Sequence, residues 1–298
     1  MTGRRRLVRA PASSANLGPG FDVLAAALDI HLELEVTETG EFEVDAGGAG
    51  LPADRANLCV RAFERLHPAD GLRFEVRSEI PVGRGLGSSA AAIVAGLLAA
   101  DHLYELGLDP PDVYRRAVEL EGHPDNVAAA LFGGFAVSPP DVGGDPASGP
   151  SIPVRLEPPQ GVEGVLAIPA DEVATGEARA ALPADVPMED AVANIAAASH
   201  LVLGIERSDL TLISRGLADR LHQPRRTDLY PRSMDLLSMA GEIGAIGATV
   251  SGAGPAVLFW CFWQDTGKVV DALTDRAGEG VELRRARFTP LGADVPEL

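Results

Sequence analysis

The chain has 298 residues, of which 46% are apolar, so it can form one large domain or two of ordinary size with packed cores. Its formal net charge of −18 opposes non-specific binding to nucleic acid or to an anionic membrane. The basic N-terminus lacks the apolar core of a signal peptide, and no apolar run approaches the roughly 18 residues of a membrane span. We therefore expect a cytoplasmic protein that binds any phosphate through a local site.

Apolar periodicity predicts an α+β chain in two parts. In the first part we expect strands at 28–36 and 72–80, and helices at 57–66, 89–106 and 111–121. A Pro/Gly-rich stretch at 138–161 predicts a boundary between domains 1–150 and 151–298. The second part is expected to hold strands at 164–169, 245–250, 256–263 and 281–288, and helices at 188–204, 209–221, 233–243 and 266–277. Cys59 and Cys261 lack metal-ligand spacing, so both are expected to be reduced and buried.

A glycine-rich segment at 81–98 predicts a loop that binds phosphate through its backbone, which we call the phosphate loop. Gly83, Gly85 and Gly87 allow tight turns that bring main-chain N–H groups close to an anion. Ser88 or Ser89 is expected to cap the Ala-rich helix that follows, whose positive end would then point into the same loop. A glycine turn before a buried helix, with no ligand, is the alternative.

The loop lacks the lysine that several phosphate-binding classes require. A Walker P-loop has lysine directly before its Ser/Thr, but Gly87 stands there, and Lys268 is the only lysine of the chain. This composition argues against a P-loop NTPase, against a protein kinase with its strand lysine, and against an enzyme that forms a Schiff base on a distant lysine.

Two further glycine-rich segments, at 10–24 and 249–258, complete a set of three loops. In their order and their sequence these loops resemble the motifs of the GHMP kinases. Within that superfamily the chain resembles the homoserine kinase family over essentially its whole length. The first motif matches at Pro11, Ser13, Ala15, Asn16, Gly18, Gly20, Phe21 and Asp22. Three more segments are similar to sequence motifs of the homoserine kinase family: 121–126, 173–183 and 221–226.

The resemblance implies an ATP- and Mg²⁺-dependent kinase for the side-chain hydroxyl of L-homoserine. It also implies an N-terminal domain like ribosomal protein S5 domain 2, a ferredoxin-like C-terminal domain, an active site between them, and a homodimer. For ATP it points to Asn57, Pro81, Gly83, Arg84, Gly85, Leu86, Gly87, Ser88, Ser89 and Ala90. For Mg²⁺ it points to Ser89 with Glu119 or Glu121, either of which could instead lie on an exposed helix face.

Homoserine carries an ammonium, a carboxylate and a hydroxyl, and the matched motifs offer partners for each. We assign the ammonium to Asp22 with Asn16 beside it, and an exposed or capping aspartate is the alternative. Arg179 and Arg226 suit the carboxylate, because a guanidinium can donate two parallel N–H bonds. Thr175 and Gly252 are the remaining residues assigned to the substrate. Arg225 is an alternative to Arg226, because the alignment of this motif depends on Pro224 alone.

The segment with His123, Asp125 and Asn126 falls where the superfamily approaches the accepting hydroxyl. Mevalonate kinases place an aspartate base there, whereas homoserine kinases are thought to pass the proton to the γ-phosphate. We therefore expect His123 and Asn126 to position the substrate, although the segment is also a good turn and helix cap in which His123 would be structural.

Three other functions remain to be weighed. A kinase for mevalonate or shikimate would not need Asp22, because those substrates have no amine. A serine hydrolase is disfavoured, since no G-x-S-x-G surrounds Ser88 or Ser89 and Lys268 is poorly placed to serve as a base. A non-catalytic ATP- or amino-acid-sensing relative would be expected to lose Ser89 and the acidic pair, and this chain keeps them.

Overall fold

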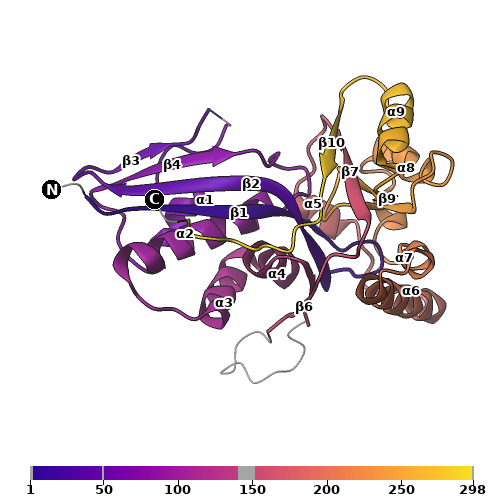
Figure 1. Cartoon of the computed structure of the whole chain (residues 1–298), viewed down its shortest axis with the longest axis horizontal. Helices are drawn as coiled ribbons and strands as arrows, with labels where there is room; N and C mark the ends of the chain where they lie inside the picture. The colour runs from indigo at the N-terminus through magenta and orange to yellow at the C-terminus, as the bar shows by residue number, and fades with distance from the viewer. Residues whose placement is uncertain (1–2, 49, 140–151, 297–298) are drawn as a thin grey trace.

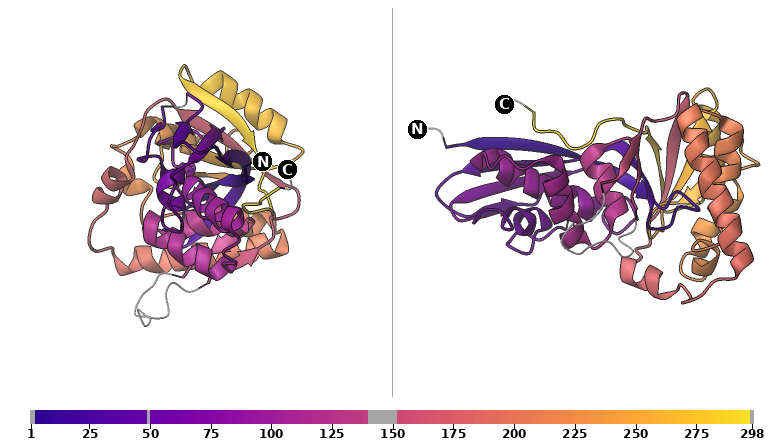
Figure 2. Two further views of the ribbon diagram at one scale, coloured as in Figure 1. Left: turned by 90° about the vertical axis from the view of Figure 1, so that its left-hand side faces the viewer. Right: turned by 90° about the horizontal axis from the view of Figure 1, so that it is seen from below.

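The computed structural model describes residues 3–48, 50–139 and 152–296. These residues form two halves, each built on its own sheet and set end to end along the long axis of the molecule (Figures 1 and 2). Within this part of the chain no helix is both long enough and apolar enough to cross a membrane.

The N-terminal half is organised around one long strand, β2 (Leu24–Glu38), which alternates buried apolar and exposed acidic side chains as predicted. It pairs with β1 (Arg5–Ala15) along most of its length, and with β4 (Leu72–Ser78) and β5 (Phe135–Val137) at its two ends. The short strands β3 (Glu43–Asp45) and β6 (Val154–Leu156) complete the order β3-β4-β2-β5-β6, in which only β3 and β4 are parallel.

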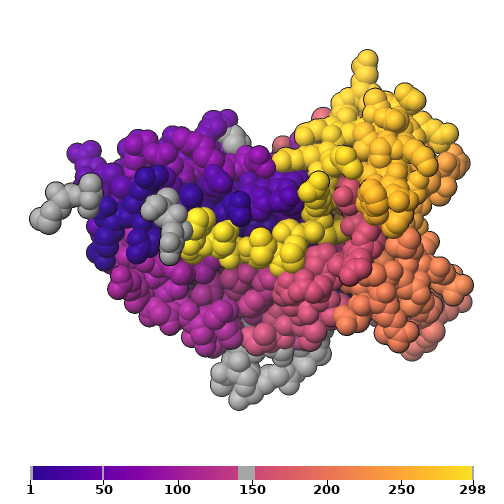
Figure 3. All heavy atoms as spheres, viewed as in Figure 1, coloured from indigo at the N-terminus to yellow at the C-terminus, as the bar shows by residue number. Residues whose placement is uncertain are grey.

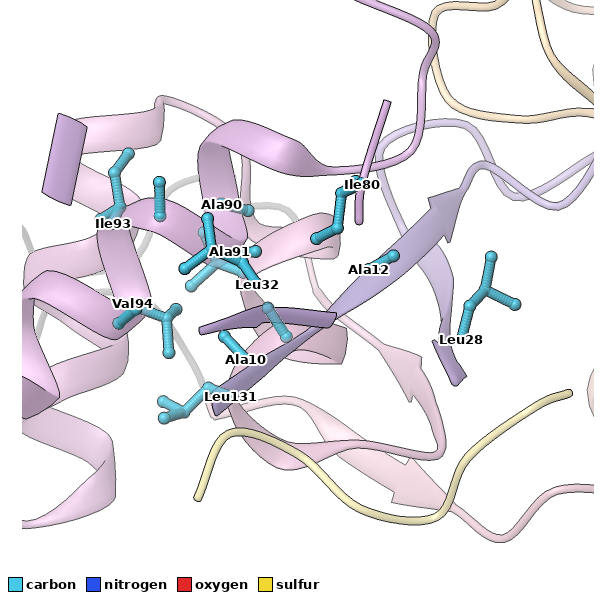
Figure 4. Close-up of a cluster of buried hydrophobic side chains, with 14 of the residues drawn as sticks. Ala10, Ala12, Leu28, Leu32, Ile80, Ala90, Ala91, Ile93, Val94 and Leu131 are labelled. Atoms are coloured by element: carbon cyan, nitrogen blue, oxygen red, sulfur yellow. The ribbon is translucent and has the colours of Figure 1, made fainter. Parts of the chain in front are cut away.

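Four helices cover this sheet: α1 (Leu58–Phe63), α2 (Ser88–Tyr104), α3 (Pro110–Glu121) and α4 (Pro124–Phe132). The Ala-rich α2 is buried along most of its length, and its residues from Ala90 to Val94 pack towards Ala10, Ala12 and Leu32 on the strands (Figure 4). Small side chains allow this close packing. At Gly96, for example, a Cβ would lie only 2.2 Å from the carbonyl oxygen of Cys59 in α1.

The C-terminal half contains four antiparallel strands in the order β10-β7-β9-β8. The strands are β7 (Val162–Pro169), β8 (Gly247–Val250), β9 (Val257–Phe262) and β10 (Val281–Ala286). Its helices are α5 (Thr175–Ala180), α6 (Met188–Arg207), α7 (Leu210–Gly216), α8 (Pro231–Ser238) and α9 (Thr266–Arg276), with a 3₁₀ turn at Pro224–Arg226. Because the first strand in sequence lies between the last and the third, this is the ferredoxin-like order that the family resemblance implied.

The boundary between the halves does not fall at a single point of the chain in the described residues. Strand β6 pairs with β5, and the segment after β10 crosses back along β1, where Arg9 and Asp294 form an isolated bridge (Figure 3). Phe288 on this segment packs between Phe135 and Trp260, with ring centroids 4.9 and 5.0 Å away. The division at 150/151 stays a prediction, since residues 140–151 lie outside the described ranges.

The structure corrects several predicted elements. The segment 10–24 was expected to be a tight loop, but β1 extends to Ala15 and only the residues between β1 and β2 form the turn. Helices α4 and α5 were not predicted, and the helix expected at 209–221 ends at Gly216, where a Cβ would lie 2.4 Å from the backbone nitrogen of Leu201. Both cysteines are buried and free, as expected.

Candidate active site

A cavity of about 540 Å³ opens between the two halves and is lined by residues from all three glycine-rich loops. This volume suits a small-molecule site. Of the predicted site residues, it is lined by Asn16, Asp22, Asn57, Gly83, Gly85, Leu86, Gly87, Ser88, Ser89, Glu121, His123, Asp125, Asn126, Thr175, Arg179, Arg226 and Gly252. Four others, Pro81, Arg84, Ala90 and Glu119, are not among its lining residues.

The phosphate loop owes its shape to backbone conformations that favour glycine. Gly83, Gly85 and Gly87 have φ values of +68°, +74° and +68°, in the left-handed region. A Cβ on Gly85 would lie 2.1 Å from the carbonyl oxygen of Ser251, whose hydroxyl donates to the Gly85 carbonyl over 2.7 Å. The third glycine loop therefore supports the first turn of the phosphate loop directly.

The expected serine cap of α2 is wrong. Gly87 occupies the N-cap position without a side-chain hydrogen bond, and Ser88 is already the first helical residue. An uncapped first turn leaves N–H groups available to an anion, which strengthens the case for a phosphate site. The Ser89 hydroxyl instead donates to the Glu121 carboxylate over 2.7 Å.

The two candidate acids are separated by the structure. Glu121 at the end of α3 is half-buried, lines the cavity and forms no ion pair within the described ranges. Burial raises its pKa, while the hydrogen bond from Ser89 acts in the opposite direction. Glu119 is exposed and faces Arg65, with 4.0 Å between Oε2 and Nη2. Only Glu121 is positioned beside Ser89.

Arg84 does not face the cavity, although it is the only cation in the phosphate loop. Its guanidinium donates to the carbonyl oxygen of Ala170 over 2.7 Å and lies 3.2 Å from the carboxylate of Glu172. Arg84 therefore ties the loop to the segment after β7. Asn57 does line the cavity, but its amide is already engaged, as the N-cap acceptor for Cys59 N–H and as a donor to the Pro52 carbonyl.

At the other end of the cavity the first motif makes a tight turn that carries an acid. Asn16 and Asp22 both have left-handed φ values, +68° and +58°. The side-chain Oδ1 of Asn16 accepts from Asp22 N–H over 3.0 Å, and its Nδ2 donates to Gly252 O over 2.8 Å. Nη2 of Arg179 donates to both carboxylate oxygens of Asp22, over 2.7 Å to Oδ1 and 2.9 Å to Oδ2. Two of the predicted substrate residues thus pair with each other.

Arg226 is the buried cation of this end, at 3% exposure on the 3₁₀ turn. Its Nε donates to Ala178 O over 2.8 Å and its Nη1 to Nδ1 of His222 over 3.1 Å, yet it forms no ion pair in the part of the chain that the structure describes. Its neighbour Arg225 instead lies 3.4 Å from Asp190 and does not line the cavity. Of the two arginines, the one that the sequence motif selects, Arg226, is thus the one that lines the cavity.

His222 orients this guanidinium and was not singled out by the sequence. Its Nε2 donates to Gly18 O over 2.9 Å, which leaves Nδ1 as the acceptor for Arg226. Burial lowers the pKa of His222, while the charge of Asp219, 3.4 Å from Nε2, acts in the opposite direction. The sequence offered one indication of this role, since His222 lies within the motif at 221–226, but only the tertiary structure reveals its hydrogen-bond partners.

The segment at the start of α4 lies beside the phosphate loop. Burial raises the pKa of Asp125 to about 7, and the negative charges of Asp22 and Glu121 add to this effect against the hydrogen bond from Asn126 N–H. The side-chain oxygen of Asn126 accepts from the hydroxyl of Ser13 over 2.8 Å. His123 occupies the N-cap position of α4 without a side-chain cap bond, so it is free of the capping role considered above.

Family models and relatives agree on the class of protein. The models described as "GHMP kinases N terminal domain" and "GHMP kinases C terminal" match residues 56–134 and 201–279. A homoserine kinase of Moorella thermoacetica is 40% identical over 86% of this chain and 87% of its own length, and one of Prochlorococcus marinus is 39% identical over 95% and 92%. The chain belongs to the homoserine kinase family of GHMP kinases.

Solved structures of this family share the fold. A crystal structure of homoserine kinase from Cytophaga hutchinsonii has a TM-score of 0.84 and 30% identity, and the match covers 98% of this chain and 97% of that one. The expected two-domain GHMP kinase fold is thus confirmed, and membership of the family makes the protein an ATP-using kinase that acts on a hydroxyl group.

A homoserine kinase also needs a place for the nucleobase, for which the sequence analysis offered only Asn57, as a contact to the ribose or the base. One end of the cavity is lined by the apolar side chains of Leu51, Pro52, Leu58, Val76 and Val82. These residues are dispersed over three separate segments and carry no motif. Only folding brings them together beside the phosphate loop, where an apolar surface suits a base.

Proposed function

We propose that the protein transfers the γ-phosphate of ATP to the side-chain hydroxyl of L-homoserine, which yields O-phospho-L-homoserine for threonine biosynthesis. The observation that carries this proposal is Arg226, a buried guanidinium without a carboxylate partner in the described residues, which opens into the same cavity as the phosphate loop. A buried cation is costly unless it is paired, so a ligand carboxylate is its natural partner. The names of the close relatives point to the same substrate.

The charges at this end of the cavity match an α-amino acid. Asp22 would accept the ammonium, while Arg179 and Arg226 would bind the carboxylate. Asp22 and Arg179 pair with each other in the free protein, but both are partly exposed, and such a pair contributes only about 0–1 kcal/mol. A zwitterion can therefore exchange partners with this pair at little cost. Thr175 and Gly252 line the same end and complete the pocket.

At the other end the loop from Gly83 to Ser89 would bind the phosphates through backbone N–H groups and the N-terminus of α2. The hydroxyl of Ser89 and the carboxylate of Glu121 are hard oxygen donors and suit Mg²⁺. No group of three His, Cys, Asp or Glu side chains gathers in the described ranges, so the two residues would share the ion with the phosphates. Bound Mg²⁺ would neutralise phosphate charge.

The residues between these two ends position the reactants. Asn126, His123 and the buried Asp125 line the cavity at the start of α4, where the homoserine hydroxyl would approach the γ-phosphate. Phosphoryl transfer depends mainly on in-line positioning and charge stabilisation. In this proposal the hydroxyl proton passes to the phosphate, and Asn126 and His123 hold the hydroxyl in line.

The decisive experiment is an ADP-release assay over a panel of small hydroxyl compounds: L-homoserine, 4-hydroxybutyrate, mevalonate and shikimate. We expect release with L-homoserine and at least 100-fold less with 4-hydroxybutyrate, which has no ammonium for Asp22. Release stimulated by mevalonate or shikimate, but not by homoserine, would instead support the other kinases considered above. Release with none of them, together with ATP binding, would support a sensor.

Two further statements belong to the proposal. A cytoplasmic location follows from the need for ATP and for a metabolite of amino-acid synthesis. A homodimer is supported by an exposed apolar stripe on α6, formed by Met188, Val192, Ile195 and Leu203. Light scattering of the protein and of Ile195→Glu would test it, since the charged variant should be monomeric and a wild-type monomer would contradict the dimer.

A further inference from the structure

Ser13 occupies an unusual position for a small polar residue. It is fully buried near the end of β1, and its backbone N–H donates to the carbonyl oxygen of Leu86 in the phosphate loop over 3.1 Å. Gly87 packs directly on its side chain, since a Cβ there would lie 2.0 Å from the Ser13 oxygen. Ser13 is thus held tightly beneath the loop while its hydroxyl reaches Asn126.

In the structure the carbonyl end of the Asn126 amide makes this contact, which leaves its NH₂ end for the cavity. The Ser13 hydroxyl donates to Oδ1 of Asn126 over 2.8 Å, so the carbonyl side of the amide is turned towards β1. Its NH₂ group has no acceptor among the described residues, and Asn126 lines the cavity. The amide therefore presents donors, and not lone pairs, to whatever binds there.

We propose that Ser13 is a positioning residue, which holds the NH₂ group of Asn126 towards the oxygen of the accepting hydroxyl or of the γ-phosphate. The inference rests on the proposed function and deepens it. An NH₂ donor stabilises negative charge on a transferring phosphate oxygen and cannot accept the hydroxyl proton. Without Ser13 the amide can rotate by 180° and present its carbonyl oxygen, which repels phosphate.

The chain offers a matched control in the next residue. Ser14 is as fully buried as Ser13 and lies on the same strand, but its hydroxyl has no hydrogen-bond partner in the described structure. We expect Ser13→Ala to lower kcat about tenfold with KM for ATP and for homoserine within twofold, since one oriented hydrogen bond is lost. Ser14→Ala should keep kcat within twofold.

A double-mutant cycle with Asn126→Ala tests whether Ser13 acts through Asn126. If it does, Ser13→Ala lowers kcat about tenfold in the wild type and less than twofold in the Asn126→Ala background. Equal losses in both backgrounds, or an unchanged kcat in Asn126→Ala alone, would overturn the proposal. Asn126→Asp tests the direction of the amide: a donor in the cavity predicts activity no higher than that of Asn126→Ala, whereas higher activity would mean that an acceptor is needed there.

A readout independent of activity separates this inference from the proposed function. The same cycle on thermal unfolding of the nucleotide-free protein should show Ser13→Ala with a lower melting temperature than Ser14→Ala, and coupling between Ser13 and Asn126. Coupling without homoserine-dependent turnover in the wild type would reject the substrate and retain the contact. An absence of coupling would reject the contact, whatever the substrate proves to be.

Discussion

In the proposed function the two ends of the cavity would recognise charge by opposite means. The phosphate end would use backbone N–H groups and glycine conformations, and the only cation in its loop, Arg84, faces away from the cavity. The amino-acid end would use charged side chains, Asp22, Arg179 and Arg226, from three distant segments. The phosphate end should therefore be sensitive to any added Cβ, whereas the other end should be sensitive to the loss of particular side chains.

The largest effect is expected from Gly85→Ala. Its Cβ would lie 2.1 Å from Ser251 O and 2.9 Å from Gly254 N, both backbone atoms that cannot move aside cheaply. We expect kcat/KM for ATP to fall by more than about 100-fold, because the loop must shift to relieve the clash. Steady-state kinetics and a melting curve would measure the loss of activity and of stability.

Gly83→Ala is the control for this prediction. Gly83 shares the left-handed φ, but the nearest atom to its Cβ would be Glu172 Cγ at 3.6 Å, an ordinary contact. Only backbone strain of about 1–2 kcal/mol remains, which corresponds to about a tenfold loss. Equal losses in Gly83→Ala and Gly85→Ala would show that strain, and not close packing against the third loop, sets the sensitivity of this end.

Removal of the buried cation should have the next largest effect. We expect Arg226→Ala to lower kcat/KM for homoserine about 100-fold, mainly through KM, and to leave KM for ATP within twofold, because the contacts of Arg226 all lie at the amino-acid end. Arg225→Ala removes the adjacent, partly exposed arginine and should change either KM by less than about threefold. If Arg225→Ala had the larger effect, the assignment of the carboxylate site would be wrong.

Asp125 lies between the two ends and predicts a pH dependence of stability. Its pKa rises from 3.8 to about 7 on folding, mainly through burial. The protonated form is therefore favoured in the folded protein, so its contribution to stability is complete below about pH 4 and is lost as pH rises through 7. Asp125→Asn removes this loss while its side-chain oxygen can still accept from Asn126 N–H.

The free energy of unfolding of Asp125→Asn, relative to the wild type, should rise by about 2–3 kcal/mol between pH 5 and pH 8. Urea unfolding without nucleotide or Mg²⁺ at the two pH values would measure it. Parallel pH profiles for the two proteins would contradict the raised pKa.

The smallest effect is expected from Arg84→Ala. Since Arg84 binds Ala170 O and Glu172, its loss should raise KM for ATP less than about threefold. A tenfold or larger rise, reduced at high salt, would instead mean that Arg84 turns towards the phosphates when they bind. The contrast between the two ends would then no longer hold.

Local patterns predicted most of the fold and the glycine turns of the loop at 83–87. The alternation in β2 and the Ala-rich composition of α2 are local properties, and both elements occur where expected. The helix α4 and the strand β1 were missed, because the small residues of α4 and of the end of β1 lack a clear period and gain their structure from tertiary packing. The serine cap failed for a related reason, since the Ser89 hydroxyl is used by Glu121 on α3.

The amino-acid sequence by itself determined the three glycine loops, the absence of a loop lysine and the motif that includes Asp22, because each depends on residues that are close in the chain. Only the tertiary structure placed Glu121 and Arg226 at the cavity and left Glu119 and Arg225 outside it. It also turned Arg84 away from the cavity and brought the hydroxyl of Ser13 within hydrogen-bond distance of the Asn126 side chain. These outcomes depend on burial and on partners distant in sequence, which no local pattern records.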